Sequence, residues 1–277
     1  MASSEPSDHF EFQAELCVPC GNKLGECPLW DDMRHKLCWI DIQGKSFWQH
    51  DPLGPAGNAQ CFHLPSRPGS FCLTGADGGY IIALETGFSF LDVDSGELTP
   101  ITEDLEPGLR TRLNDGRVDC QGRFVVSGCV DKGDVPISAV YRLNTDLTVE
   151  RLLENVRCGN SICFSDAGMF FADPAFRGTD SEPVGTANTI WRFADYASTG
   201  MAGPSQVFVN AAGRPDGSLI DAEGCLWNAE FGGGRVVRYL PDGSVSMIVK
   251  APVRYTTCAT FGGAELQTMY ITDASAP

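Results

Sequence analysis

A segment pattern recurs along this chain, at four of five intervals after 43 to 45 residues, and this repeat restricts the fold more than any other feature. Each unit begins with a polar turn containing Asp or Gly and continues with a short β-rich segment, as in GADGGYIIAL and DCQGRFVVSG. The central residues of successive units are separated by intervals of 43, 44, 45, 57 and 43, and they are Cys38, Ile81, Val125, Phe170, Trp227 and Tyr270. Periods of about 40–50 residues with several strands each are typical of β-propeller blades.

A further strand follows most of these segments, in FSFLDV, AVYRL, TIWRF and RVVRYL, and turns such as LPDGS suit hairpins. Six units predict an all-β, six-bladed propeller, with an insertion in the fourth interval at residues 176–188 (FRGTDSEPVGTAN). We expect residues 1–15 to form an N-terminal tail and residues 16–277 a single propeller domain. A generic β-sandwich would explain the strand content but not the regular spacing.

Composition restricts the partners and the compartment. The chain has 43% hydrophobic and 20% charged residues, and its net charge of -16 opposes binding to nucleic acid or to anionic membranes. The N-terminal segment has no basic stretch followed by an apolar core, and no apolar run approaches the roughly 18–20 residues of a membrane span. We therefore expect a cytoplasmic protein.

The 12 cysteines are spread along the chain, many of them inside apolar segments. Only Cys17 and Cys20 form a C-x-x-C pair, and no second pair completes a zinc finger. We expect reduced, mostly buried thiols, with a redox or metal role as the alternative.

A propeller binds ligands around its central channel, so a site should consist of single polar residues from separate repeats. Glu26 in LGECPLW, Asn160 in RCGNSICF and Asp216 in GRPDGSLID fit this pattern. Taken singly, Glu26 is typical of a loop carboxylate and Asp216 of a Pro-Asp-Gly turn. Together, their carboxylate and amide oxygens would suit hard cations such as calcium or magnesium.

The four histidines narrow the choice of metal chemistry, because they all lie in the first quarter of the chain: His9, His35, His50 and His63. A zinc site built from several histidines around the ring is therefore excluded. Zinc held by oxygen ligands stays open.

The stretch TRLNDGRVD, residues 111–119, allows two interpretations. Asn114-Asp115-Gly116 alone is typical of a tight turn between two strands. Arg112 and Asn114, however, are two residues apart and would point to one side of a strand, where they could bind an oxygen-rich ligand.

These segments resemble a known family. They are similar to segments of the gluconolactonase, regucalcin (senescence marker protein) and luciferin-regenerating enzyme family, and they occur in family order from about residue 16 to 273. The similar segments are LGECPLW, CWIDIQG, TRLNDGRVD followed by GRF, GNSICFS and RPDGSLIDAEGCLWNAEFGGGRVVRY. The resemblance implies a six-bladed propeller with one divalent metal ion in the channel, with calcium favoured over zinc, magnesium or manganese.

The resemblance also implies roles for individual residues. Glu26, Asn160 and Asp216 would be the metal ligands, and Arg112, Asn114 and Asp131 (in GCVDKGD) would contact the substrate. The implied reaction is hydrolysis of a sugar lactone to its aldonic acid, with Asp216 also acting as general base. Two alternatives are a calcium-binding regulatory protein and an ester or organophosphate hydrolase that uses the same metal site.

Three departures from the family pattern stand out. Ser218 follows Pro-Asp-Gly where the family commonly has Met, and Asn228 follows Leu-Trp where a small apolar residue is usual. The family usually continues past YITDASA with another strand, whereas this sequence stops at Pro277. We therefore expect an incomplete last blade, and either reduced stability of a monomer or dimerisation through the exposed edge.

Overall fold

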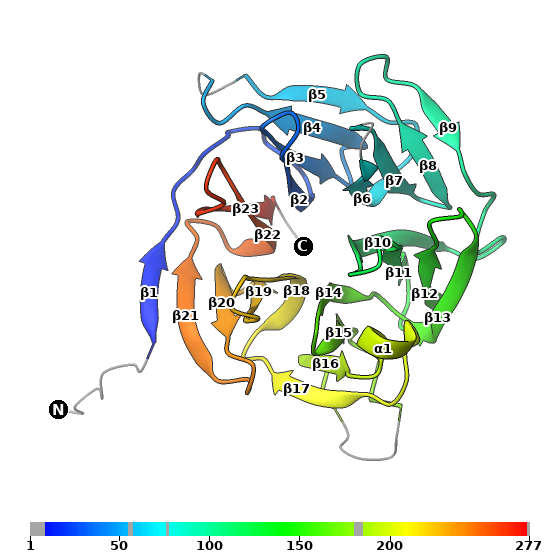
Figure 1. The fold of residues 1–277 in the computed structure, drawn as a ribbon, viewed down its shortest axis with the longest axis vertical. Coiled ribbons are helices and arrows are strands. Elements are labelled where there is room, and N and C mark those ends of the chain that lie inside the picture. Colours follow the sequence, from blue (N-terminus) through cyan, green and yellow to red (C-terminus); the bar gives the residue numbers. More distant parts are fainter. Residues whose placement is uncertain (1–8, 55–57, 76–77, 180–184, 276–277) are drawn as a thin grey trace.

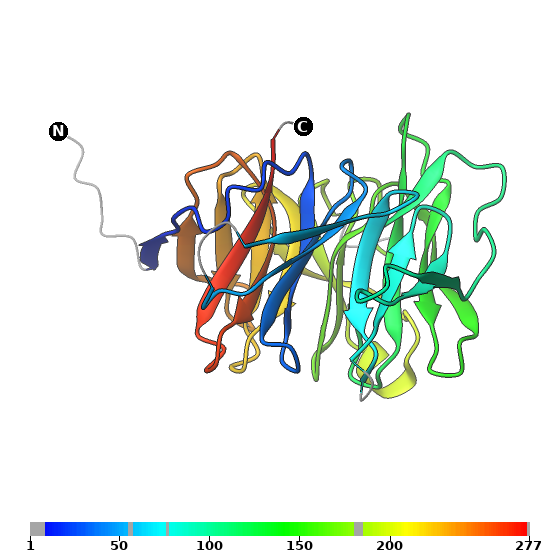
Figure 2. The same cartoon turned by 90° about the horizontal axis from the view of Figure 1, so that it is seen from above.

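The computed structural model describes residues 9–54, 58–75, 78–179 and 185–275, and these residues form mainly β-strands. The sheets are arranged in a ring around a central axis (Figure 1), and the ring is shallow when seen from the side (Figure 2). The described residues contain one short helix, α1 (Tyr196–Thr199). No described helix has the length and apolar character that crossing a membrane requires. Residues 180–184 of the predicted insertion lie outside the described residues.

Four of the sheets each contain four consecutive antiparallel strands. Their strands, sheet by sheet, are β2 (Gly25–Asp31), β3 (Lys36–Asp41), β4 (Ser46–His50) and β5 (Gln60–His63); β6 (Pro68–Leu73), β7 (Tyr80–Leu84), β8 (Phe88–Leu91) and β9 (Leu98–Pro100); β10 (Thr111–Val118), β11 (Phe124–Val130), β12 (Ser138–Leu143) and β13 (Val149–Val156); β14 (Asn160–Ser165), β15 (Gly168–Ala172), β16 (Thr189–Phe193) and β17 (Gln206–Asn210). The repeat residues Cys38, Ile81, Val125 and Phe170 lie in the second strand of their sheets, as the spacing predicts.

The remaining strands form one seven-stranded sheet. They are β18 (Arg214–Ile220), β19 (Leu226–Phe231), β20 (Arg235–Tyr239), β21 (Val245–Lys250), β22 (Tyr255–Gly262), β23 (Thr268–Ala274) and β1 (Phe10–Gln13). β22 joins β19 through one residue pair, Phe231 and Tyr255. β1 pairs in parallel with β21, so part of the segment predicted as an N-terminal tail is a strand. The all-β, propeller-like prediction is confirmed, although hydrogen bonding groups the described strands into five sheets.

In two of the units, an Asp side chain stabilises the polar turn between the first and second strands. The Oδ1 atom of Asp119 accepts hydrogen bonds from the backbone N–H groups of Gln121 and Arg123, both at 2.9 Å. Asp221 does the same for Glu223 at 2.9 Å and Cys225 at 3.0 Å. Such Asx turns reverse the chain between two strands, which places the first two strands of a unit side by side.

The core lies between neighbouring sheets. Phe47 of β4, Phe71 of β6 and Tyr80 of β7 are buried together, and the rings of Phe47 and Phe71 meet edge to face with centroids 4.9 Å apart. Burial of each such side chain contributes roughly 1.5–3 kcal/mol, so the repeating apolar segments stabilise contacts between sheets.

The first strand of each unit lies nearest the axis. β2, β6, β10, β14, β18 and β22 pack successively on one another, and β22 packs on β2. A bridge between Leu24 and Ala274 closes the ring, and the Thr257 hydroxyl donates a 2.5 Å hydrogen bond to the carbonyl of Gly25. These inner strands carry all the predicted site residues except Asp131.

Candidate functional site

A β-bulge occurs in each inner strand that carries a predicted metal ligand or either of Arg112 and Asn114. The pairing with the second strand shifts between Glu26 and Leu29, between Leu113 and Gly116, between Asn160 and Cys163, and between Pro215 and Ser218. A bulge bends its strand and redirects the side chains at the extra residues. Each of these bulges therefore lies at or next to one of the predicted polar side chains.

The two predicted turns in these segments are wrong. Residues 111–118 form the continuous strand β10 and residues 214–220 form β18, so Asn-Asp-Gly and Pro-Asp-Gly mark bulges instead. Glycine serves close packing here, because a Cβ on Gly116 would lie 2.7 Å from the Val125 carbonyl oxygen. Turns and bulges favour the same residues, so the local sequence did not distinguish them. Glu26 likewise lies in β2 rather than in a loop.

Four of the predicted residues form a connected network of buried side chains. Arg112 donates a 2.6 Å hydrogen bond to Oδ1 of Asn114. Asn114 in turn donates from Nδ2 to the Gly159 carbonyl at 2.9 Å and to Oδ1 of Asn160 at 3.0 Å. Asn160 lies 3.0 Å from Oδ1 of Asp216. The structure therefore brings together residues from three sheets.

Glu26 and Asp216 belong to a cluster of buried carboxyl groups that also contains Asp115. Burial, and then the negative charge of Asp115, raises the pKa of Glu26. Burial and the charge of Glu26 raise the pKa of Asp216 well above its ordinary value. Burial also raises the pKa of Asp115 to about 6, while Arg117 and backbone hydrogen bonds oppose that increase.

This carboxyl cluster fits a cation. Among the residues that the structure describes, Glu26, Asp115 and Asp216 form no salt bridge with a basic side chain. Oδ1 of Asn160 faces Oδ1 of Asp216 at 3.0 Å, a contact between two acceptors unless the amide is turned to present its nitrogen. Converging carboxylate and amide oxygens are the ligands that hard divalent cations prefer.

The sequence pattern did not indicate Asp115 and Arg117 as parts of this region. Oδ2 of Asp115 accepts a 2.8 Å hydrogen bond from the backbone N–H of Ile162, which stabilises the neighbouring bulge. Arg117 reaches from β10 to the carbonyl oxygens of Ser218 and Ala259, both at 3.3 Å. One sequence signal could have indicated Asp115 and Arg117: both are charged and both lie in a segment that could be read as a strand.

Asp131 lies just after β11, beside Arg112 but outside the network described above. Arg67 binds both of its carboxylate oxygens, at 2.8 and 2.7 Å, and thereby lowers the pKa of Asp131. Burial and the positive charge of Arg67 lower the pKa of Arg112 to about 10. Arg67 also binds Glu85 at 2.5 Å, so this partly exposed region contains an ion-pair cluster.

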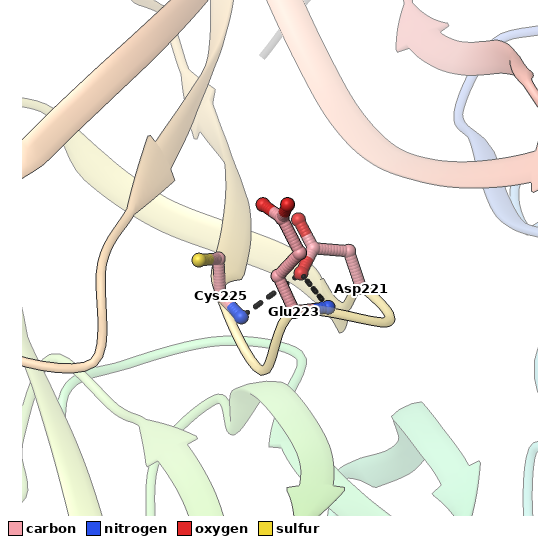
Figure 3. Close-up of side chains that lie close together, drawn as sticks. All are labelled: Asp221, Glu223 and Cys225. Carbon is pink, nitrogen blue, oxygen red and sulfur yellow. Dashed lines mark hydrogen bonds between the residues drawn. The ribbon is translucent and has the colours of Figure 1, made fainter.

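A second acidic cluster consists of Asp221, Glu223 and Cys225 (Figure 3). The Asp221 carboxylate lies inside its turn and accepts hydrogen bonds from the backbone N–H groups of Glu223 and Cys225. Arg238 binds Asp221 at 2.7 Å and also pairs with Glu223. Because a guanidinium already neutralises both carboxylates, this cluster is explained as a structural turn.

Two cysteines correct the prediction of reduced thiols. Cys129 and Cys158 are joined by a disulfide, and they lie 29 residues apart in the sequence. Cys129 lies in β11, two residues before Asp131, and Cys158 lies between β13 and β14, two residues before Asn160, so the bond lies beside the network. Their spacing forms no recognisable motif, since only the packing of β11 against the segment before β14 brings them together. Of the other ten cysteines, six are buried.

Comparisons with known proteins show which proteins this chain is similar to. The sequence profile described as SMP-30/Gluconolactonase/LRE-like region matches residues 24–275. The chain is 38% identical over 275 residues to L-arabinolactonase of Azospirillum brasilense, covering 96% of this chain and 86% of that protein. It is 32% identical to 6-deoxy-6-sulfogluconolactonase of Pseudomonas putida, covering 91% and 83%. The crystal structure of regucalcin from Agrobacterium tumefaciens, a calcium-binding protein, has a TM-score of 0.85 and 27% identity, covering 96% of this chain and 88% of that one.

Proposed function

The chain belongs to the SMP-30/gluconolactonase/LRE-like family, and from this premise we propose that it hydrolyses a sugar lactone to the aldonic acid with the help of one divalent metal ion. The observation that carries the proposal is that Glu26, Asn160 and Asp216 come from separate inner strands, that Asn160 lies 3.0 Å from Asp216 and that the Glu26 charge acts on Asp216. Neither carboxylate forms a salt bridge among the described residues. Relatives named as lactonases support the reaction type.

Glu26, Asn160 and Asp216 would hold the ion. When bound, it would supply polarisation of the lactone carbonyl and lower the pKa of an adjacent water. Calcium is the first choice, because the donors are carboxylate and amide oxygens and a similar structure is that of a calcium-binding protein. Zinc, magnesium and manganese are the alternatives.

Asp216 would take a proton from the attacking water as the water oxygen bonds to the carbonyl carbon. The ring C–O bond then breaks, and Asp216 returns the proton to the ring oxygen, which becomes a hydroxyl of the aldonic acid. Burial keeps bulk water from competing for this proton, so proton transfer depends on the position of the Asp216 carboxylate.

Substrate positioning falls to Arg112, Asn114 and Asp131. Arg112 donates hydrogen bonds from Nη1 to Oδ1 of Asn114 and to the carbonyl of Leu113. The other N–H groups of its guanidinium would bind sugar or carbonyl oxygens. Asp131 would accept hydrogen bonds from sugar hydroxyls while Arg67 holds it in place. Fixing the sugar at several points favours attack by water from one direction.

The decisive experiment measures acid release from lactones by protein stripped of metal and then given calcium, zinc, magnesium or manganese. The panel would contain L-arabinolactone, gluconolactone and 6-deoxy-6-sulfogluconolactone, since relatives are named for these substrates. We expect metal-dependent turnover by the wild type and its loss in Asp216→Ala, with folding checked by circular dichroism.

Glu223→Gln provides the matched control, because it removes a carboxylate from the other acidic cluster. Its metal-dependent turnover should equal that of the wild type, and a loss there would move the metal site to residues 221–225. Folded protein that binds metal but opens no lactone would favour the calcium-binding regulatory protein. Turnover restricted to esters or organophosphates would favour the other hydrolase.

We also propose that residues 16–277 form one domain with six blades. The six inner strands pack successively around the axis, and all six carry a bulge, since β6 shifts register between Pro68 and Ser70 and β22 between Thr256 and Cys258. The single pair that joins β22 to β19 suggests that β22 and β23 belong to a sixth blade. A cytoplasmic location and the choice between monomer and dimer stay predictions.

A further inference from the structure

The backbone carbonyl of Asp216 is held by side chains from two other strands. The pairing of β18 with β19 passes from Pro215 directly to Ser218, so Asp216 lies outside the regular ladder. Its carbonyl oxygen accepts a 2.7 Å hydrogen bond from the Ser161 hydroxyl of β14. It accepts a second, at 3.3 Å, from Nδ2 of Asn228 on β19. The peptide that follows Asp216 is thus fixed from two sides.

The side chains that hold this carbonyl are bonded to one another and have no exposed surface. Nδ2 of Asn228 lies 3.1 Å from the Ser161 hydroxyl and 2.9 Å from the Ser218 hydroxyl, and all three residues are 0% exposed. Ser161 has a φ of 57°, a left-handed conformation that a serine seldom adopts. The surrounding contacts must compensate for the strain of this conformation.

Ser218 and Asn228 face each other in register across β18 and β19, and their side chains are hydrogen-bonded at 2.9 Å. The hydrogen-bonded group of Ser161, Ser218 and Asn228 adjoins both proposed ligands. It contacts the carbonyl of Asp216, and Ser161 directly follows Asn160 in the sequence.

We propose that Ser161 and Asn228 are positioning residues that set the distance between the Asn160 and Asp216 side chains and thereby determine the affinity for the divalent ion. This inference rests on the proposed function, which makes Asn160 and Asp216 metal ligands. Because both residues act through the backbone at the two bulges, neither needs to touch the ion. Partners that orient metal ligands typically contribute about 10- to 100-fold to affinity.

Calorimetric titration of metal-stripped protein with calcium chloride tests this role directly. Ser161→Ala removes one hydrogen bond to the carbonyl, and Asn228→Leu removes the other at similar side-chain volume. Ser138→Ala is the control, since Ser138 is equally a buried serine, 1% exposed, but its hydroxyl donates to Glu106. Thermal unfolding of each metal-free variant records the purely structural effect.

We expect all three variants to lose some thermal stability, but only Ser161→Ala and Asn228→Leu to bind calcium about ten-fold or more weakly. Wild-type affinity in both would overturn the inference, while loss of binding in Asp216→Ala would leave the proposed metal site standing. A wild type that binds none of the four divalent ions would overturn both. If Asn228→Leu does not fold, Ser161→Ala decides by the same criterion.

Discussion

Asp216→Asn should make the metal-free protein more stable at pH 8, although it removes a proposed ligand. The Asp216 carboxyl is buried beside Glu26, and both effects raise its pKa well above the ordinary value. A carboxyl with a raised pKa in the folded state contributes stability below its unfolded pKa, and that contribution is lost as the pH rises through the folded pKa. The amide of the variant has no charge to bury, so the variant avoids this loss.

The neighbouring Asp115 provides the scale of the effect. Its pKa rises from 3.8 to about 6, and each pH unit corresponds to about 1.4 kcal/mol. An ionised carboxylate at this location therefore costs about 3 kcal/mol relative to water. The Asp216 carboxyl is also deeply buried and its pKa is raised in the same direction, so we expect Asp216→Asn to be more stable than the wild type at pH 8. At pH 4, where the wild-type carboxyl is protonated, the two proteins should differ little.

Urea unfolding of metal-stripped protein at pH 4 and pH 8 measures this difference. Asp119→Asn serves as the control of opposite sign. Burial alone would raise the pKa of Asp119, but its bonds with Arg123 and Tyr196 lower it. Its stabilising contribution is therefore present at pH 8 and lost as the pH falls, and its amide variant should be less stable at pH 8.

Two results would refute this reasoning. If Asp216→Asn were less stable than the wild type in metal-free buffer at pH 8, the ionised carboxylate would have a favourable partner in the fold. If calcium stabilised the variant as much as the wild type, Asp216 would not be a metal ligand. The expected result is a gain without metal and no further gain when calcium is added.

Three further predictions follow from the same contacts. Calcium affinity should rise between pH 5 and pH 8, because the Glu26 and Asp216 carboxyl groups have raised pKa values and must release protons when calcium binds. Calorimetry in two buffers of different ionisation enthalpy should detect this proton release. Arg67→Gln removes the partly exposed ion pair that holds Asp131, so it should raise KM for the lactone about two- to five-fold with little change in kcat. Steady-state kinetics measure both constants, and a lower kcat with an unchanged KM would contradict this prediction. Replacing Cys129 and Cys158 together by serine should lower the free energy of unfolding by about 3 kcal/mol, because the disulfide closes a loop across a sequence separation of 29. An unchanged midpoint of urea unfolding would refute this prediction.

The all-β, propeller-like fold followed from the sequence because the repeat is a local and regular signal. Each unit contains a polar turn with Asp or Gly and an apolar segment that must bury one face, and stacking neighbouring units is the way to bury them all. The residues chosen as centres of the six units, from Cys38 to Tyr270, all lie in the second strand of their unit. Regular spacing therefore predicted both the strands and their arrangement around an axis.

The site was predictable only in part. The resemblance selected Glu26, Arg112, Asn114, Asn160 and Asp216, and the fold brings these residues to inner strands that pack on one another. The bulges that redirect them were read as turns, since Asn-Asp-Gly and Pro-Asp-Gly have the same local preferences in both settings.

The sequence by itself determined the repeat, the strand content and the types of residue available at the axis, because these depend on neighbours in the chain. Only the tertiary structure decided which of those residues meet. Asp115 joins the carboxyl cluster, Asn228 reaches Asp216, and Cys129 bonds to Cys158 through contacts between different strands. Closing the ring sets these contacts, since a hydrogen bond or a charge interaction depends on separation in space and not on separation along the chain.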